Sequence, residues 1–240
     1  MGAVRTWTGF GLTLALGMAC RVPTVATAKQ DSSPVFDAPT SCATVKAWAD
    51  CLQGHEQRQL EKHHSRATRD GRALRLALKS GTQLVLEDVA TPEDESTNYH
   101  FQDYLSDLGL YVVFVRFYED WEWWIVEERS GKKLSFVGSP LLSPDRKHLA
   151  AGGLSKCKDT EELALIAVER GELRVAWSLK VGSRSWGLSK PRWLNEATLE
   201  LKRVECEHMG AGEGEKLLLR HDPAGWQLES TAGKPIPSPR

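Results

Sequence analysis

The sequence predicts a mainly β protein, in which an antiparallel meander of hairpin units forms a propeller-like or curved open sheet after a short N-terminal helical segment. Two observations predict this class. Alternation of apolar and polar residues, typical of half-buried strands, recurs on both sides of tight glycine turns throughout residues 70–230. The 3.6-residue spacing of an amphipathic helix is clear only within residues 41–66. A β-sandwich is the alternative arrangement of the same strands.

Residues 1–28 have the order of features of a secretory signal peptide. Arg5 precedes an apolar run over residues 7–20, and Ala26-Thr27-Ala28 offers a small-x-small cleavage site. The run is shorter than the about 20 apolar residues that a membrane span needs. We therefore expect a mature chain that begins at Lys29, has no transmembrane span and is periplasmic or extracellular. Lipid anchoring at Cys20 is disfavoured, because glycine stands three residues before it, where lipoproteins carry a branched apolar residue.

The charge balance argues against a nucleic-acid partner. The chain has 31 basic and 32 acidic side chains. Loss of residues 1–28 removes two basic side chains and no acidic one, which leaves a net charge of −3. Nucleic-acid-binding domains usually carry a basic face or stripe, and this sequence has no such concentration. The expected partner is a protein or a glycan.

Four cysteines follow the predicted cleavage site, and an even number in an exported chain predicts disulfides. Cys42 directly precedes a helix predicted over residues 43–53, and Cys51 lies within that helix. Nine helical residues span about 13 Å, whereas bridged cysteines have Cα atoms within about 7 Å. These two cysteines can therefore pair only if the helix breaks or begins late. We predict a disulfide between Cys157 and Cys206, which fall at loop or strand-end positions; four free buried thiols are the alternative.

The elements follow a simple order along the chain. Residues 29–40 are a linker with two prolines, and residues 41–66 are the helical appendage, whose polar second half is predicted to lie on the surface. Residues 231–240 form a flexible, proline-rich tail. The β domain between them contains four predicted hairpins: residues 72–86 around Ser80-Gly81, 123–137 around Ser130-Gly131, 163–177 around Arg170-Gly171, and 216–228 around Ala224-Gly225.

A second type of turn alternates with these hairpins. Pro144 and Asp145 open a short strand over residues 142–150, because proline presets the first central turn position and aspartate tolerates the second. Residues 193–201 repeat this design, and residues 105–111 are a fainter copy. The segment Ser143-Pro144-Asp145-x-Lys147 resembles the turn in blades of TolB-like and WD-repeat β-propellers, which occurs in many exported bacterial proteins of unknown function. The resemblance implies blades of several strands per 40–50 residues and no particular activity.

The segment Tyr118–Trp124 has the most unusual composition. On a strand, Trp121 and Trp123 share one face, while Glu122 and Trp124 share the other. Exposed indoles beside carboxylates can stack on sugar rings and accept hydrogen bonds from hydroxyl groups. In the competing interpretation the tryptophans fill a core. We select Trp121, Glu122, Trp123 and Trp124 as candidate ligand-binding residues.

No catalytic, metal or cofactor motif is found in the sequence. Gly-x-Ser-x-Gly and phosphate-binding glycine loops are absent, and Gln59 stands where a His-Glu-x-x-His site beginning at His55 would need histidine. The sequence therefore favours an exported, non-catalytic binding or interaction module of the cell envelope without a cofactor. The alternatives are a hydrolase acting on envelope or extracellular polymers, and an inhibitor or immunity-type protein.

Overall fold

The structure is a computed structural model that describes residues 45–91, 96–118, 120–152, 161–181, 186–205 and 214–230. In these ranges the helix α1 (Val45–Lys62) precedes fifteen strands. The strand bounds are β1 Ala67–Asp70, β2 Ala73–Ala77, β3 Gln83–Glu87, β4 Asn98–Leu105, β5 Leu110–Arg116, β6 Trp121–Glu127, β7 Lys133–Phe136, β8 Leu141–Leu142, β9 His148–Gly152, β10 Glu161–Glu169, β11 Glu172–Val181, β12 Trp186–Asn195, β13 Thr198–Glu205, β14 Glu215–Asp222 and β15 Gly225–Ser230.

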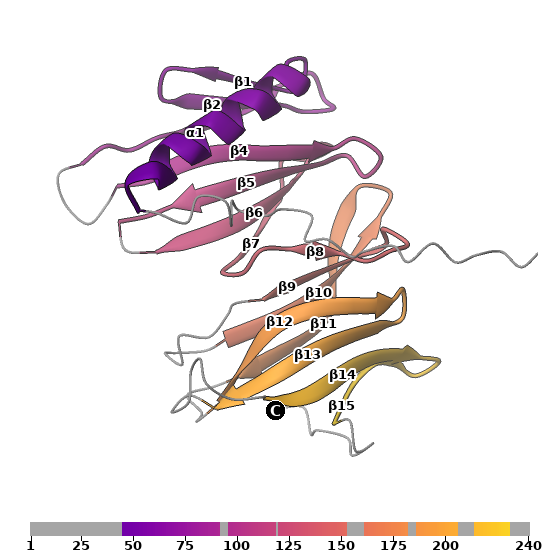
Figure 1. The fold of residues 1–240 in the computed structure, drawn as a ribbon. Helices are drawn as coiled ribbons and strands as arrows, with labels where there is room; N and C mark the ends of the chain where they lie inside the picture. Colours follow the sequence, from indigo (N-terminus) through magenta and orange to yellow (C-terminus); the bar gives the residue numbers. More distant parts are fainter. Residues whose placement is uncertain are drawn as a thin grey trace, which may run out of the picture. The chain divides into compact units, whose positions relative to one another are not determined.

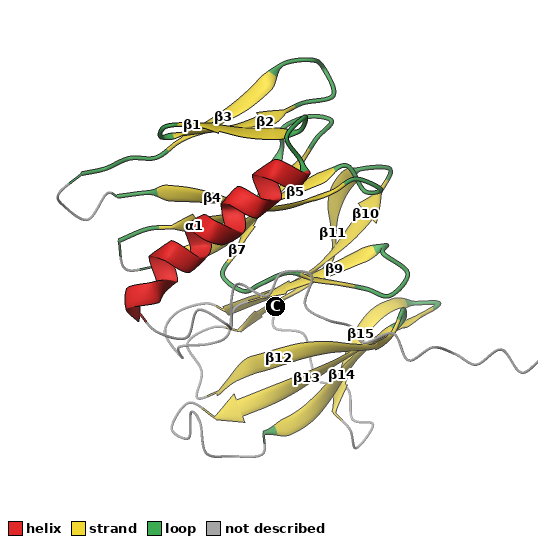
Figure 2. Cartoon of the chain, turned by 45° about the horizontal axis from the view of Figure 1, so that its top comes forward, coloured by secondary structure: helices red, strands yellow, loops and turns green. Residues whose placement is uncertain are grey.

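The strands form four antiparallel sheets, each a meander of consecutive strands (Figure 1). The first sheet is β1–β3, the second β4–β7, the third β8–β11 and the fourth β12–β15. Figure 2 shows α1, in red, beside β4 of the second sheet. The mainly β class with an N-terminal helix is thus confirmed. The predicted signal peptide, linker and proline-rich tail, and both cysteines of the predicted Cys157–Cys206 disulfide, lie outside the described residues.

All four predicted glycine hairpins are present. Positive φ angles occur at Gly81, Gly131, Gly171 and Gly225 in their turns, a backbone region that glycine enters without steric cost. Gly171 has a second constraint, because a Cβ atom there would lie 3.2 Å from the carbonyl oxygen of Leu108. The β10–β11 turn therefore approaches the β4–β5 turn closely.

The turn that resembles those of propeller blades joins β8 to β9. The Ser143 hydroxyl donates to Asp145 Oδ1 at 2.6 Å and accepts from the His148 amide at 3.0 Å. Arg146 adopts a φ of 60°, at the position where the resembled turns carry glycine. Its guanidinium binds Asp107 of the β4–β5 turn at 2.6 and 2.7 Å, a bidentate contact that offsets the backbone cost.

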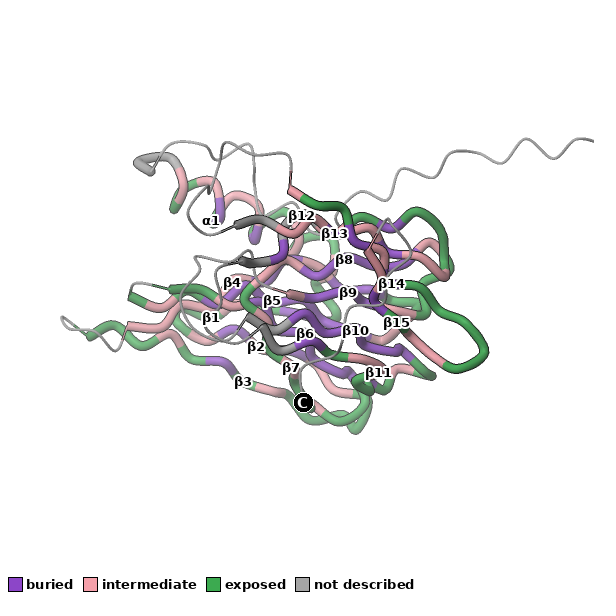
Figure 3. The backbone as a smooth tube through the Cα atoms, turned by 90° about the horizontal axis from the view of Figure 1, so that it is seen from below, coloured by how far each residue is buried: buried purple, intermediate pink, exposed green. Residues whose placement is uncertain are grey.

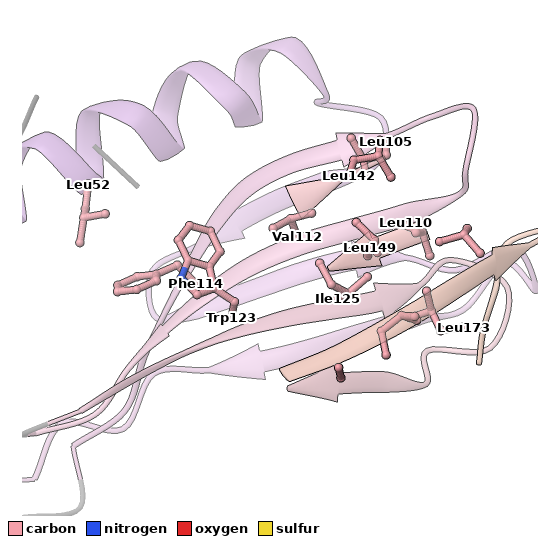
Figure 4. Packing of buried hydrophobic residues seen from close by; sticks show 13 residues of the cluster. Leu52, Leu105, Leu110, Val112, Phe114, Trp123, Ile125, Leu142, Leu149 and Leu173 are labelled. Atoms are coloured by element: carbon pink, nitrogen blue, oxygen red, sulfur yellow. The ribbon is translucent and has the colours of Figure 1, made fainter. Parts of the chain in front are cut away.

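Three clusters of buried apolar side chains join each sheet to the next in chain order. The central strand β5 illustrates the pattern, because Tyr111, Val113 and Val115 point into the first cluster while Val112 and Phe114 point into the second. The first cluster joins the first and second sheets. The second cluster, shown in Figure 4, joins α1, the second sheet and the third sheet. The third cluster joins the third and fourth sheets. Figure 3 shows the buried residues concentrated along the strands.

Two consecutive buried carboxylates, Glu127 at the end of β6 and Glu128 directly after it, add polar contacts between successive sheets. Glu127 accepts the Leu173 amide of the third sheet at 2.8 Å and the Ser130 hydroxyl. Glu128 accepts the Arg66 guanidinium, just before β1, at 2.7 Å and the Tyr104 hydroxyl at 3.1 Å. Successive side chains of a strand point to opposite faces, so this pair ties the second sheet to both of its neighbours.

The second half of α1 lies mostly at the surface, as the sequence predicts, but one of its polar side chains does not. Glu56 is buried, and its Oε1 accepts from the Phe101 amide at 3.0 Å and from Arg69 Nε and Nη2 at 3.1 and 2.8 Å. Arg69 also binds Asp88 at 3.0 Å. The helix is thereby fixed to β1 and β4 by polar groups, which a search for apolar spacing does not detect. No helix in the described part of the chain is long and apolar enough to cross a membrane.

Candidate functional site

Strand β6 presents the four candidate ligand-binding residues to very different surroundings. Trp123 is 2% exposed and packs in the second core cluster, whereas Trp124 is 7% exposed and packs in the first. Trp121, at the start of the strand, is 38% exposed. Glu122 is half-buried. The predicted assignment of the tryptophans to opposite faces is therefore confirmed, and only Trp121 offers substantial surface to a ligand.

The two buried tryptophans are engaged by their neighbours. The Trp123 ring meets Phe114 edge-on, with centroids 5.2 Å apart. The indole N–H of Trp124 donates to Glu122 Oε2 at 2.8 Å, and Lys133 Nζ lies 3.3 Å from the Trp124 ring centroid. Trp124 therefore has a charged group over its ring and a carboxylate on its only donor. The structure brings Glu122 and Trp124 together as a packing unit rather than as a ligand platform.

The exposed part of this region is the tip of the β5–β6 hairpin. We call Arg116, Tyr118, Asp120 and Trp121 the aromatic hairpin. Tyr118 is 57% exposed. Arg116 lies opposite Trp121 in the antiparallel register, so both side chains project from the same face. The turn is held by Asp120, whose Oδ1 accepts the Trp121 amide at 2.8 Å and whose carbonyl accepts the Phe117 amide at 2.8 Å.

The aromatic hairpin is continuous with the first turn of α1. The Arg116 guanidinium lies 5.6 Å from the Trp48 ring centroid, a cation–π distance. Trp48 in turn packs edge-on against Phe114, with centroids 5.8 Å apart. Arg116, Tyr118 and Trp48 were not among the residues selected from the sequence. Alternation alone does not locate the β5–β6 turn, so the sequence did not predict that Arg116 pairs with Trp121. Trp48 belongs to a separate element, the helix α1.

Four carboxyl groups of the described residues have pKa values below the usual range. Burial opposes ionisation of Glu56, but its contacts with His100, the Phe101 amide and Arg69 hold its pKa below the usual value. Hydrogen bonds from Arg146 lower the pKa of Asp107, and those from Arg192 lower the pKa of Glu200. Asp145 also has a lowered pKa, because the Ser143 hydroxyl and the Lys147 amide outweigh its burial. A general acid for glycoside cleavage needs a raised carboxyl pKa, so none of these four fits that role.

The serine of the β8–β9 turn is not available as a nucleophile, and the described residues hold no metal-binding cluster. The Ser143 hydroxyl is buried and is used by Asp145 and the His148 amide. Within the ranges that the structure describes, no group of three or more His, Cys, Asp or Glu side chains is placed to hold a metal ion. The aromatic hairpin is therefore the best-supported candidate site, and its chemistry is stacking, ion pairing and hydrogen bonding.

Comparisons with protein-family models, with curated proteins and with solved structures gave no match. The functional interpretation therefore depends on the residues and geometry of this chain.

Proposed function

We propose that this protein is an exported, non-catalytic binding or interaction module of the cell envelope, whose aromatic hairpin contacts a protein or glycan partner. The observation that carries the proposal is the exposure of Tyr118 in the β5–β6 turn and of Trp121 at the start of β6, the strand whose next two tryptophans are buried. The buried pair makes the strand a rigid support for the exposed pair. Trp, Tyr and Arg are the residue types enriched at binding hot spots, and all three occur in this hairpin.

Four carboxyl groups of the described residues are unsuited to the role of a glycosidase general acid. The four carboxyl groups with shifted pKa values all shift downward, toward permanent ionisation. An inhibitor or immunity-type protein is the second candidate, because such a protein needs an exposed loop that reaches into its partner. The aromatic hairpin, with Tyr118 next to its tip, is a loop of that kind.

Export is supported by the cysteine chemistry. Cys51 is the one cysteine among the described residues, and a disulfide at this position would accord with an oxidising compartment. Intact mass of protein from the cell envelope should begin at Lys29, and non-reducing peptide mapping should link Cys157 to Cys206. A full-length cytosolic form would contradict export, and a Cys157 peptide linked to Cys42 or Cys51 would contradict the pairing.

The binding proposal can be tested with labelled protein on a glycan array and on immobilised envelope proteins. The double variant Tyr118→Ala/Trp121→Ala should lose about tenfold or more in affinity for any partner the wild type binds, as loss of hot-spot aromatics does. Val175→Ala is the matched control, because Val175 is 51% exposed on β11 and lies outside the aromatic hairpin. Equal binding by the double variant and the control would exclude the aromatic hairpin as the binding surface.

A further inference from the structure

Four aromatic side chains meet where the fourth sheet packs against the third. His148 begins β9, and its ring centroid lies 5.2 Å from that of Trp226 and 6.5 Å from that of Trp193. His221 makes a tilted ring contact with the same tryptophan, with its centroid 4.9 Å from that of Trp226. We call His148, Trp193, His221 and Trp226 the histidine joint. The Trp193 indole N–H donates to the Leu141 carbonyl at 3.1 Å, which fixes this ring between the two sheets.

The two ring nitrogens of His148 differ in their surroundings. Nδ1 is buried and has no hydrogen-bond partner. The neutral ring can keep Nδ1 unprotonated by carrying its single proton on Nε2. A second proton would have to be placed on Nδ1, where no acceptor is available. A buried donor without a partner costs about 1–3 kcal/mol, and more when it is charged.

Charged groups of both signs surround His148. Its own turn supplies Asp145 and Lys147, β10 supplies Glu169, and β14 supplies His221. The side chains that face it from β12 and β15, Trp193 and Trp226, are uncharged. Asp145 already accepts the Ser143 hydroxyl and the Lys147 amide. Burial lowers the pKa of His148; Asp145 and Glu169 oppose this effect, while His221 and Lys147 add to it.

We propose that the histidine joint is an acid-sensitive contact, which holds the β14–β15 hairpin against the third sheet while His148 is neutral and releases it when Nδ1 is protonated. The folded state favours neutral His148, so this stabilisation is complete above the ordinary pKa of 6.5 and declines as the pH falls below it toward the folded-state pKa. The apolar residues of the third core cluster are unaffected by protons and continue to hold the sheets. Only the end of the β14–β15 hairpin that contains its turn is therefore released.

Two measurements on the full mature chain test this proposal. Histidine NMR titration should give His148 a midpoint below 6.5, and His221→Gln should raise that midpoint by removing a repelling charge. Hydrogen exchange, corrected for intrinsic rates, should accelerate at least about threefold in β14 and β15 between about pH 7.5 and pH 5. His148→Phe keeps a ring against the tryptophans, loses no side-chain hydrogen bond and should abolish the acceleration. His64→Gln, at an exposed histidine of the α1–β1 turn, is the control that should leave it intact.

Either of two results would overturn the proposal. A wild-type His148 midpoint at or above 6.5 would show that the folded state does not resist protonation, and this measurement needs no variant. Equal acid-induced exchange in His148→Phe and the wild type would show that the response arises elsewhere.

Discussion

Replacement of the three β6 tryptophans by alanine should have sharply different costs. Trp123 and Trp124 are 2% and 7% exposed, and truncation of a buried tryptophan typically costs about 3–5 kcal/mol. Trp123→Ala also removes the edge-on contact with Phe114, and Trp124→Ala leaves Glu122 and Lys133 without their ring partner. Trp121 is 38% exposed, so Trp121→Ala should cost about 1 kcal/mol or less.

These free energies correspond to separable changes in melting temperature. For a domain of 150–250 residues, 1 kcal/mol shifts the Tm by about 2–4 °C. Trp123→Ala and Trp124→Ala should therefore lower the Tm by roughly 6–20 °C, whereas Trp121→Ala should lower it by less than about 4 °C. Thermal melts followed by far-ultraviolet circular dichroism give these values, and urea unfolding provides the corresponding free energies.

The three variants together test how the hairpin is supported. Trp123→Phe is the matched control, because it keeps a ring against Phe114 and should recover a large part of the loss. If Trp121→Ala were as damaging as Trp123→Ala, Trp121 would belong to the core and the aromatic hairpin would lose its role as a binding surface. If Trp123→Ala and Trp124→Ala were harmless, the assignment of these rings to the core clusters would be refuted.

Three further changes have defined outcomes. Glu56→Gln should cost roughly 2–3 kcal/mol near neutral pH, less than a fully unpaired buried charge, because Asp88 still binds Arg69. Burial opposes ionisation of Glu56, but its contacts with His100, the Phe101 amide and Arg69 lower its pKa. The wild-type advantage is therefore complete above 4.5 and should vanish as the pH falls through the folded-state pKa, which urea melts at several pH values would reveal. Gly171→Ala should cost at least about 1–2 kcal/mol in the same assay, because the left-handed backbone there is strained for alanine. Arg146→Gly should change stability by less than about 1 kcal/mol, because relief of backbone strain opposes loss of an exposed ion pair, and a larger loss would show that this pair is stronger than surface pairs usually are.

The hairpins were predictable because their signals are local. Gly81 and Gly131 lie between alternating segments only a few residues away, so each turn and its two strands could be identified from one short window. Burial of Glu56 was not predictable, because its partner Arg69 lies on a strand 13 residues away and no apolar periodicity marks the contact. Polar networks formed by tertiary structure leave no periodic trace in the sequence.

The candidate site was predicted only in part. Alternation placed Trp121 and Trp123 on one face, but it does not show which of the two side chains is covered by other parts of the protein. In the structure, Phe114 packs against Trp123, and Trp48 of α1 packs against Phe114. Trp121 lies two residue pairs nearer the turn and is left 38% exposed. Which residues of an apolar face remain exposed depends on the position of a separate element, here the helix.

The packing of each sheet on the next in chain order has a consequence for how this protein is made. A chain that emerges N-terminus first, from a ribosome or through a membrane pore, can complete each hydrophobic cluster as soon as the following sheet arrives. The first and last sheets carry surface ion pairs, such as Arg72 with Glu87 and Lys216 with Glu200. Assembly can thus proceed in one direction, and no early-formed apolar surface has to wait for the end of the chain to cover it.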